Sequence, residues 1–144
     1  MYKVQAESLE EYFAADPART SDLKALDAAV RHNAPALKRW FYAGAKAGEP
    51  GMQFKLIGYG TTLYRDLPGT KWPIIGIALQ KNYISVYLAI AKPDASLITE
   101  DYRGKLGESR MGQNNFSFET FGQLDQASVA SLLKDVARLA APTP

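Results

Sequence analysis

The residues that could do chemistry in this chain are tyrosines, scattered charged side chains and one histidine. The sequence has no cysteine, which excludes a disulfide, a thiolate nucleophile and a cysteine-ligated zinc or iron–sulfur centre. A Ser-His-Asp triad would have to use His32, and no serine lies in a Gly-x-Ser-x-Gly turn. At helical spacing, His32 falls opposite the apolar stripe of Leu23, Leu26 and Val30, so we expect it to be exposed. An enzyme using Tyr, Arg and carboxylates is a residual hypothesis without a specific constellation.

The most informative segment is 77–89, IALQKNYISVYLA, in which two runs rich in β-branched and aromatic residues meet at Lys81-Asn82. A two-residue turn at this point makes Gln80 face Tyr83, and Asn tolerates the left-handed conformation that such turns require. Pairing then places the larger apolar residues on one face, which must be buried. The residues predicted on this face are Ile75, Ile77, Leu79, Ile84, Val86 and Leu88.

The opposite face of this hairpin combines small residues with tyrosines, because Gly76 meets Tyr87 and Ala78 meets Ser85. A tyrosine ring supplies apolar area, whereas its hydroxyl needs water or a partner. We therefore predict a platform that binds a small molecule or a protein segment. The alternative is a half-covered sheet whose tyrosines pack under a loop or against a second copy, which leaves a homodimer open. The predicted platform residues are Tyr59, Tyr64, Trp72 and Tyr87.

Two further groups of residues could hold ions. The connector 104–115, GKLGESRMGQNN, offers Arg110 and backbone N–H groups to an anion, although it matches no phosphate-binding motif and also suits a plain turn-rich connector. We include Arg110 in the candidate site. Acidic residues cluster in the first predicted helix and at Glu100-Asp101, where iron or magnesium could bind weakly. Such acidic first turns also complement the helix dipole, so we assign no metal ligand and no cofactor. The acidic cluster of the first helix is Glu7, Glu10 and Glu11.

The elements that position these residues follow the order helices, strands, helix. Ser8 and Glu11 predict a capping box at the first helix, and Asp125 predicts the cap of the last one. Connections between the strands are too short for parallel crossovers, so the sheet is predicted to be mainly antiparallel. Helices are expected after residues 8 and 20, over 98–106 and after 125, and strands within 54–64, 72–79, 83–91 and 114–121.

The sequence thus predicts one α+β domain over residues 1–144, with an antiparallel sheet packed against N- and C-terminal helices. A hydrophobic content of 47% and a charged content of 22% are ordinary for a soluble globular domain. The net charge of +2 provides no strong attraction to nucleic acid or to a membrane surface. We see no signal peptide and no membrane span, so a cytoplasmic location is predicted.

Several segments also carry a family resemblance: IGYGTTLY, WPIIGIALQKNYISVYL, YRGKLGESRMGQNNFSF, LDQASVASLLKDV and the opening SLEEYFAA. In order and spacing they resemble the YdhG-like domain of small bacterial proteins. The resemblance implies a compact α+β domain with an antiparallel sheet on N- and C-terminal helices. The family tyrosines are present as Tyr59 and Tyr87. Many members carry a Lys and a Cys where this chain has residues 113–115, QNN. This chain therefore lacks the side chains for any role that depends on that lysine or thiol.

The resemblance implies little about activity, since the family is largely of unknown function. Some members are described as frataxin-like iron chaperones, which implies iron binding and delivery through surface carboxylates as an alternative function. The leading hypothesis is a non-enzymatic binding domain that holds a small molecule or a protein segment on the tyrosine-lined face.

Overall fold

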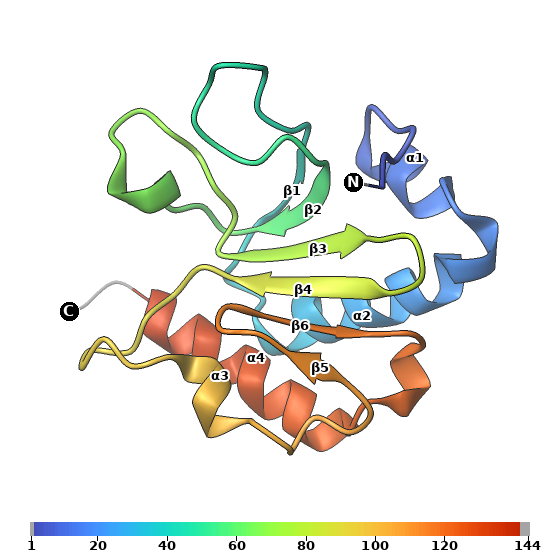
Figure 1. Ribbon diagram of the computed structural model, residues 1–144. Helices are drawn as coiled ribbons and strands as arrows, with labels where there is room; N and C mark the ends of the chain where they lie inside the picture. The colour runs from blue at the N-terminus through green and yellow to red at the C-terminus, as the bar shows by residue number, and fades with distance from the viewer. Residues whose placement is uncertain (1, 142–144) are drawn as a thin grey trace.

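The computed structural model describes residues 2–141 as a six-stranded antiparallel sheet with helices on one face (Figure 1). The strand order is β1-β2-β3-β4-β6-β5, and every neighbouring pair is antiparallel. The predicted α+β class with an antiparallel sheet is therefore confirmed. The strands are β1 (Arg39–Tyr42), β2 (Leu56–Tyr59), β3 (Ile75–Leu79), β4 (Ile84–Leu88), β5 (Arg110–Met111) and β6 (Asn115–Phe118). The helices are α1 (Leu9–Ala14), α2 (Thr20–Asn33), α3 (Ile98–Asp101) and α4 (Gln126–Ala140).

The central β3–β4 hairpin has the predicted register. Ile77 pairs with Val86, and Gly76 pairs with Tyr87. The predicted left-handed turn is wrong, because neither residue 81 nor residue 82 is among the described residues with positive φ. The turn closes instead through the Gln80 N–H, which donates to the Tyr83 carbonyl oxygen at 2.9 Å. The apolar face, rather than a special turn geometry, thus accounts for the register.

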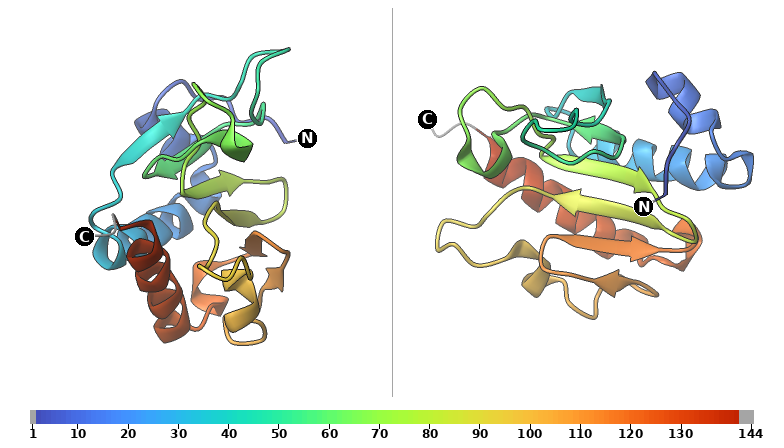
Figure 2. Two further views of the ribbon diagram at one scale, coloured as in Figure 1. Left: turned by 90° about the vertical axis from the view of Figure 1, so that its left-hand side faces the viewer. Right: turned by 45° about the horizontal axis from the view of Figure 1, so that its top comes forward.

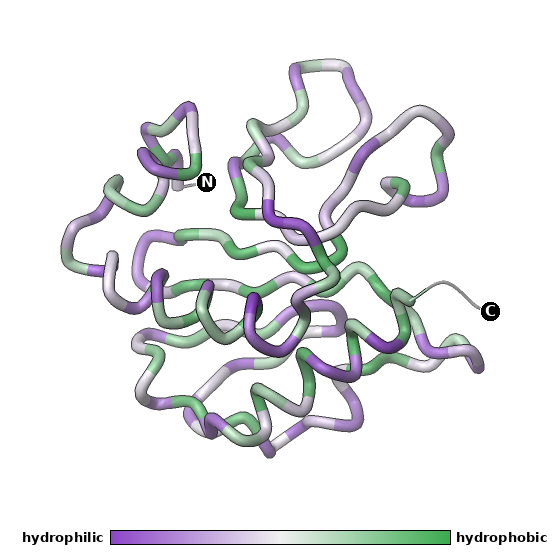
Figure 3. Tube along the Cα trace, turned by 180° about the vertical axis from the view of Figure 1, so that it is seen from behind, coloured by the Kyte–Doolittle hydropathy of each residue, from purple (hydrophilic) through white to green (hydrophobic). Residues whose placement is uncertain are grey.

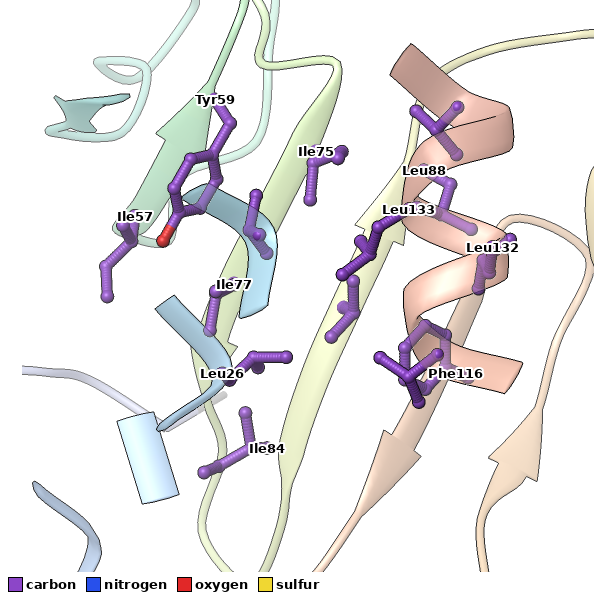
Figure 4. Close-up of a cluster of buried hydrophobic side chains, with 14 of the residues drawn as sticks. Leu26, Ile57, Tyr59, Ile75, Ile77, Ile84, Leu88, Phe116, Leu132 and Leu133 are labelled. Carbon is purple, nitrogen blue, oxygen red and sulfur yellow. The ribbon is translucent and has the colours of Figure 1, made fainter. Parts of the chain in front are cut away.

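The core lies between the sheet and the helices α2 and α4, which cover one face of it (Figure 2). Ile84, Val86 and Leu88 are 2% exposed or less, as the pairing predicts. Figure 4 shows sheet residues meeting Leu26 of α2 and Leu132 and Leu133 of α4. Burying one such side chain contributes roughly 1.5–3 kcal/mol, so burial of this face strongly favours the observed fold. Seen from behind, hydrophilic and hydrophobic residues alternate along both helices, as amphipathic helices require (Figure 3).

Local signals explain where the helices begin and end. The Glu11 N–H donates to Ser8 Oγ at 3.2 Å, and the Glu11 carboxylate accepts from the Glu7 N–H at 3.0 Å, so the predicted box closes one residue earlier than expected. Asp125 caps α4 by accepting from the Ser128 N–H at 3.0 Å. The helix expected over 98–106 ends at residue 101, and the chain then turns through Gly104, whose φ is +76°.

Two strands were missed by the sequence analysis. The aromatic run 40–42, WFY, lies in the edge strand β1, where Phe41 faces the helices while Trp40 and Tyr42 face the other way. The connector 104–115 contains the two-residue strand β5. Its brevity hides any alternation of polar and apolar residues, so the sequence offered no strand pattern to detect.

The second face of the sheet is partly covered by the connections 43–55 and 60–74, which lie side by side over the β1–β3 half (Figures 1 and 2). We call these two connections the outer layer. They enclose a small second core that includes Tyr42, Leu56 and Trp72. Strand glycines make the approach possible, because a Cβ at Gly58 would lie 2.9 Å from the Pro73 Cβ. Across residues 2–141, the chain forms no helix with the length and apolar character that a membrane crossing needs.

Candidate functional site: an aromatic groove

An open groove of about 750 Å³ lies where the outer layer meets the end of β4. We call it the aromatic groove. Its rings come from both connections of the outer layer and from β4, and residues 65 and 66 form part of its rim. The volume lies within the range of roughly 300–1,000 Å³ that small-molecule sites occupy. The aromatic side chains that line the groove are Phe54, Tyr64, Trp72 and Tyr87.

Three of the predicted platform residues are brought together by this groove. Tyr87 points away from the helices because the register of β4 sends Val86 and Leu88 inward. Trp72 enters from the outer layer, where it pairs with Thr62 in an isolated antiparallel bridge. Tyr64, two residues after Thr62, begins a short 3₁₀ turn that spans Tyr64–Asp66. The structure therefore brings Tyr64, Trp72 and Tyr87 to one surface, while their role in binding stays a prediction.

The aromatic walls are held in place by ring-to-ring contacts. The Trp72 ring lies 5.1 Å from the Tyr42 ring and 5.4 Å from the Tyr64 ring, both in edge-to-face orientation. The Phe54 and Tyr87 rings lie 5.6 Å apart and are inclined by 40°. Such pairs contribute about 0.5–1.5 kcal/mol beyond the burial of their area. The wall is thus preorganised before any ligand arrives.

The phenol groups at the groove remain largely free to bond a ligand. The Tyr87 hydroxyl accepts a long hydrogen bond from Gln80 Nε2 at 3.4 Å, and the Ser85 side chain is a second donor close to it. Burial raises the pKa of Tyr87, so this hydroxyl stays protonated and can donate. The Tyr64 hydroxyl contacts Met52 Sδ at 3.9 Å, which is a weak acceptor. Tyr42 is instead committed to structure, since its hydroxyl donates to the Met52 carbonyl oxygen at 3.1 Å.

Tyr59 lies on the opposite face, so its predicted place on the platform is wrong. It pairs with Ile75, and both side chains point towards the helices (Figure 4). The Tyr59 hydroxyl donates to Asp27 Oδ1 at 2.5 Å, and Arg39 Nη1 donates to Asp27 Oδ2 at 2.9 Å. Burial, together with the hydrogen bond to Asp27, raises the pKa of Tyr59. The residue that faces the outer layer is its neighbour Gly58, and the sequence could not choose between the two because glycines flank Tyr59 on both sides.

Arg110 does not line the aromatic groove. It lies on β5, with its guanidinium carbon 5.8 Å from the centre of the Tyr83 ring. It borders a separate hollow of about 340 Å³ that also contains Glu108 and Glu119. Two carboxylates oppose an anion there, so the predicted role of Arg110 gains no support. The predicted connector instead contributes Asn114 to the aromatic groove.

Sequence analysis missed Phe54, Arg65 and Asp66 as groove residues. Phe54 was placed only within the predicted strand 54–64, and residues 65 and 66 follow the end of that predicted strand. Arg65 and Asp66 adopt φ values of +49° and +60°, a region that is uncommon for arginine and less so for aspartate. No pattern in the sequence predicts that conformation. The aromatic content of 52–64, by contrast, could have indicated Phe54 as a groove residue.

Most of the acidic residues proposed for iron have other partners. Glu7 Oε1 lies 3.0 Å from Lys55 Nζ, and Asp101 Oδ2 lies 3.0 Å from Lys92 Nζ. Glu100 pairs with Arg103 at 2.8 Å. Nowhere between residues 2 and 141 do three or more His, Asp or Glu side chains gather closely enough to hold a metal ion. His32 is exposed, as predicted. Iron delivery stays a prediction from the family resemblance alone.

The chain matches no protein-family model, no curated protein and no solved structure. The resemblance to the YdhG-like domain therefore stays a prediction based on the segments quoted above, and the case for function depends on the geometry of the groove.

Proposed function

We propose that this chain is a binding domain that holds a small molecule in the aromatic groove. The observation that carries the proposal is the convergence of Tyr64, Trp72 and Tyr87 with Phe54 around one open volume of about 750 Å³. Tyr64 and Tyr87 are half-buried, so apolar ring area is still available to a ligand. Free hydroxyls beside apolar rings are the combination that small-molecule sites use to orient their ligands.

The outer layer supports a small molecule more than a protein segment. It surrounds the groove on the side of residues 52–54 and 62–66, which limits how long a straight segment could lie across it. Each aromatic contact with a ligand is worth about 0.5–1.5 kcal/mol beyond area burial, so a few rings give useful affinity to a compact ligand. A protein segment on the same surface is the second outcome that the test below distinguishes.

The test is a screen of small aromatic compounds by amide NMR on the full-length chain. We expect binders to shift the resonances of Phe54, Tyr64, Trp72 and Tyr87 together, and to change tryptophan fluorescence through Trp72. Tyr87→Ala should weaken binding by about tenfold, since it removes one wall and one hydroxyl.

The matched control is Tyr83→Ala, because Tyr83 lies on the same side of the same hairpin but borders the separate hollow at β5. This variant should bind as the unaltered chain does. Compounds that shift only residues outside the groove, or equal losses in the two variants, would contradict the proposal. Shifts caused only by peptides, and never by compact compounds, would assign the groove to a protein segment instead.

A further inference from the structure

Two oppositely charged side chains stand at the rim of the aromatic groove without ion-pair partners. Arg65 and Asp66 are both exposed, and both line the groove. Among residues 2–141, neither is within ion-pair distance of an opposite charge, including each other. The Arg65 guanidinium carbon lies 5.3 Å from the centre of the Tyr64 ring, which leaves the guanidinium N–H groups available at its edge. The groove therefore presents one free cation and one free anion side by side.

The backbone holds these two residues in an unusual conformation. Arg65 has φ +49° and ψ +40°, and Asp66 has φ +60°, so both occupy the left-handed region. This conformation is costly for arginine, although aspartate enters it more readily, and it persists at Arg65 only when the surroundings impose it. The surrounding turn does so through the Tyr64 N–H, which donates to Thr70 Oγ1 at 2.8 Å, and the Leu67 N–H, which donates to the Tyr64 carbonyl at 2.9 Å. The charged pair is thus positioned by a braced turn.

We propose that the ligand of the aromatic groove is a zwitterion with an aromatic body, of which an aromatic α-amino acid is the simplest example. Its carboxylate would accept from the Arg65 guanidinium, its ammonium group would donate to the Asp66 carboxylate, and its ring would lie against Phe54 and Tyr87. This inference rests on the proposed function of the same groove. It adds the chemical class of the ligand.

Charge complementarity is the reason to prefer a zwitterion over a singly charged ligand. A cation at this rim would be attracted by Asp66 but repelled by Arg65. An anion would be attracted by Arg65 but repelled by Asp66. A molecule whose ammonium and carboxylate groups are attached to one carbon, as in an α-amino acid, can satisfy the two side chains at once. Hydrogen bonds between charged groups are also stronger than those between neutral groups, so both charges should contribute to affinity.

The test compares three molecules that share an indole ring, by calorimetry on the full-length chain. L-Tryptophan carries both charges, tryptamine carries only the ammonium group, and indole-3-propionate carries only the carboxylate. We expect L-tryptophan to bind at least about tenfold more tightly than either singly charged analogue, because each analogue forfeits one charged hydrogen bond.

Two conservative variants assign the charges to their residues. Arg65→Gln should reduce the affinity for L-tryptophan to about that for tryptamine, while leaving tryptamine binding unchanged or improved. Asp66→Asn should do the same relative to indole-3-propionate, and asparagine tolerates the left-handed conformation, so the turn should survive. Arg110→Gln, at the separate hollow, is the matched control and should change nothing.

The outcomes separate this inference from the proposed function. If all three indoles bind equally, or if Arg65→Gln and Asp66→Asn leave L-tryptophan binding unchanged while Tyr87→Ala weakens it, the groove binds ligands but the zwitterion assignment is wrong. If no indole binds, yet uncharged aromatic compounds still shift the groove resonances, the assignment is again wrong and the proposed function stands. If no compound of any class reaches the groove, both fail.

Discussion

The Tyr59 phenol and the Asp27 carboxylate form a buried hydrogen bond between β2 and α2. Asp27 is only 6% exposed, and it accepts from the Tyr59 hydroxyl and from Arg39. A carboxylate so poorly hydrated needs every donor it has, because an unsatisfied buried charge is expensive. Tyr59 therefore stabilises the core through its hydrogen bond to Asp27 and does not line the groove.

We expect Tyr59→Phe to lower the free energy of unfolding by about 1–3 kcal/mol, since it removes a donor from a buried carboxylate while keeping the ring. Urea denaturation would measure the loss. The control is Tyr83→Phe, whose hydroxyl has no hydrogen-bond partner in the part of the chain that is described, and which should cost less than about 0.5 kcal/mol. Equal stability of the two variants would show that the Tyr59 hydroxyl contributes nothing.

At the scale of elements, strand glycines determine how closely the outer layer sits on the sheet. Gly58 and Gly76 pair with each other in adjacent strands, and a Cβ on either would meet Pro73 of the outer layer. A Cβ at Gly58 would lie 2.9 Å from the Pro73 Cβ and 3.1 Å from the Trp40 ring. The aromatic groove depends on this contact, because Trp72 adjoins Pro73.

Gly58→Ala should therefore destabilise the fold by about 1–3 kcal/mol through overpacking. It should also displace Trp72, which a change in tryptophan fluorescence would report. Gly122→Ala is the matched control, since a Cβ at Gly122 would meet no atom within 4 Å and should leave both stability and fluorescence nearly unchanged. A Gly58→Ala variant that matches this control in both measurements would refute the close-approach argument.

At the scale of the whole molecule, the sheet separates a helix-covered core from a loop-covered face. The main core contains two deeply buried phenols, Tyr12 and Tyr59, whose pKa values are raised chiefly by burial. The Tyr12 hydroxyl accepts from the Leu79 N–H at 2.8 Å and donates to the Lys55 carbonyl at 3.2 Å. Ionising either phenol in the folded protein would place an anion in the core, so unfolding becomes the easier route to deprotonation.

The stability of the molecule should consequently fall at alkaline pH. Between about pH 10 and the raised native pKa values, the unfolded chain loses these phenol protons while the native state keeps them, so the free energy of unfolding decreases as pH rises. The slope is about 1.4 kcal/mol per pH unit for each phenol. Urea denaturation at several alkaline pH values would measure it, and Tyr59→Phe should remove one phenol's share. A flat profile across this range would contradict the assigned burial.

The sequence by itself determined the elements whose patterns depend on near neighbours. The alternation within 75–88 predicted the hairpin register, because a one-residue slip of either strand would turn its three buried apolar side chains to the opposite face. Ser8 and Asp125 predicted two helix starts, because capping joins residues only a few positions apart. These patterns also predicted the face on which Tyr87 lies.

Tertiary structure alone decided which residues share the groove with Tyr87. Tyr59 went to the core because Asp27, 32 residues earlier, supplies a buried acceptor, and Gly58 took the outer position. Arg65 and Asp66 lie at the rim because of a left-handed turn, and their residue types do not predict such a turn. Such choices depend on contacts between segments far apart in the chain, whose energies no local pattern of residue types contains.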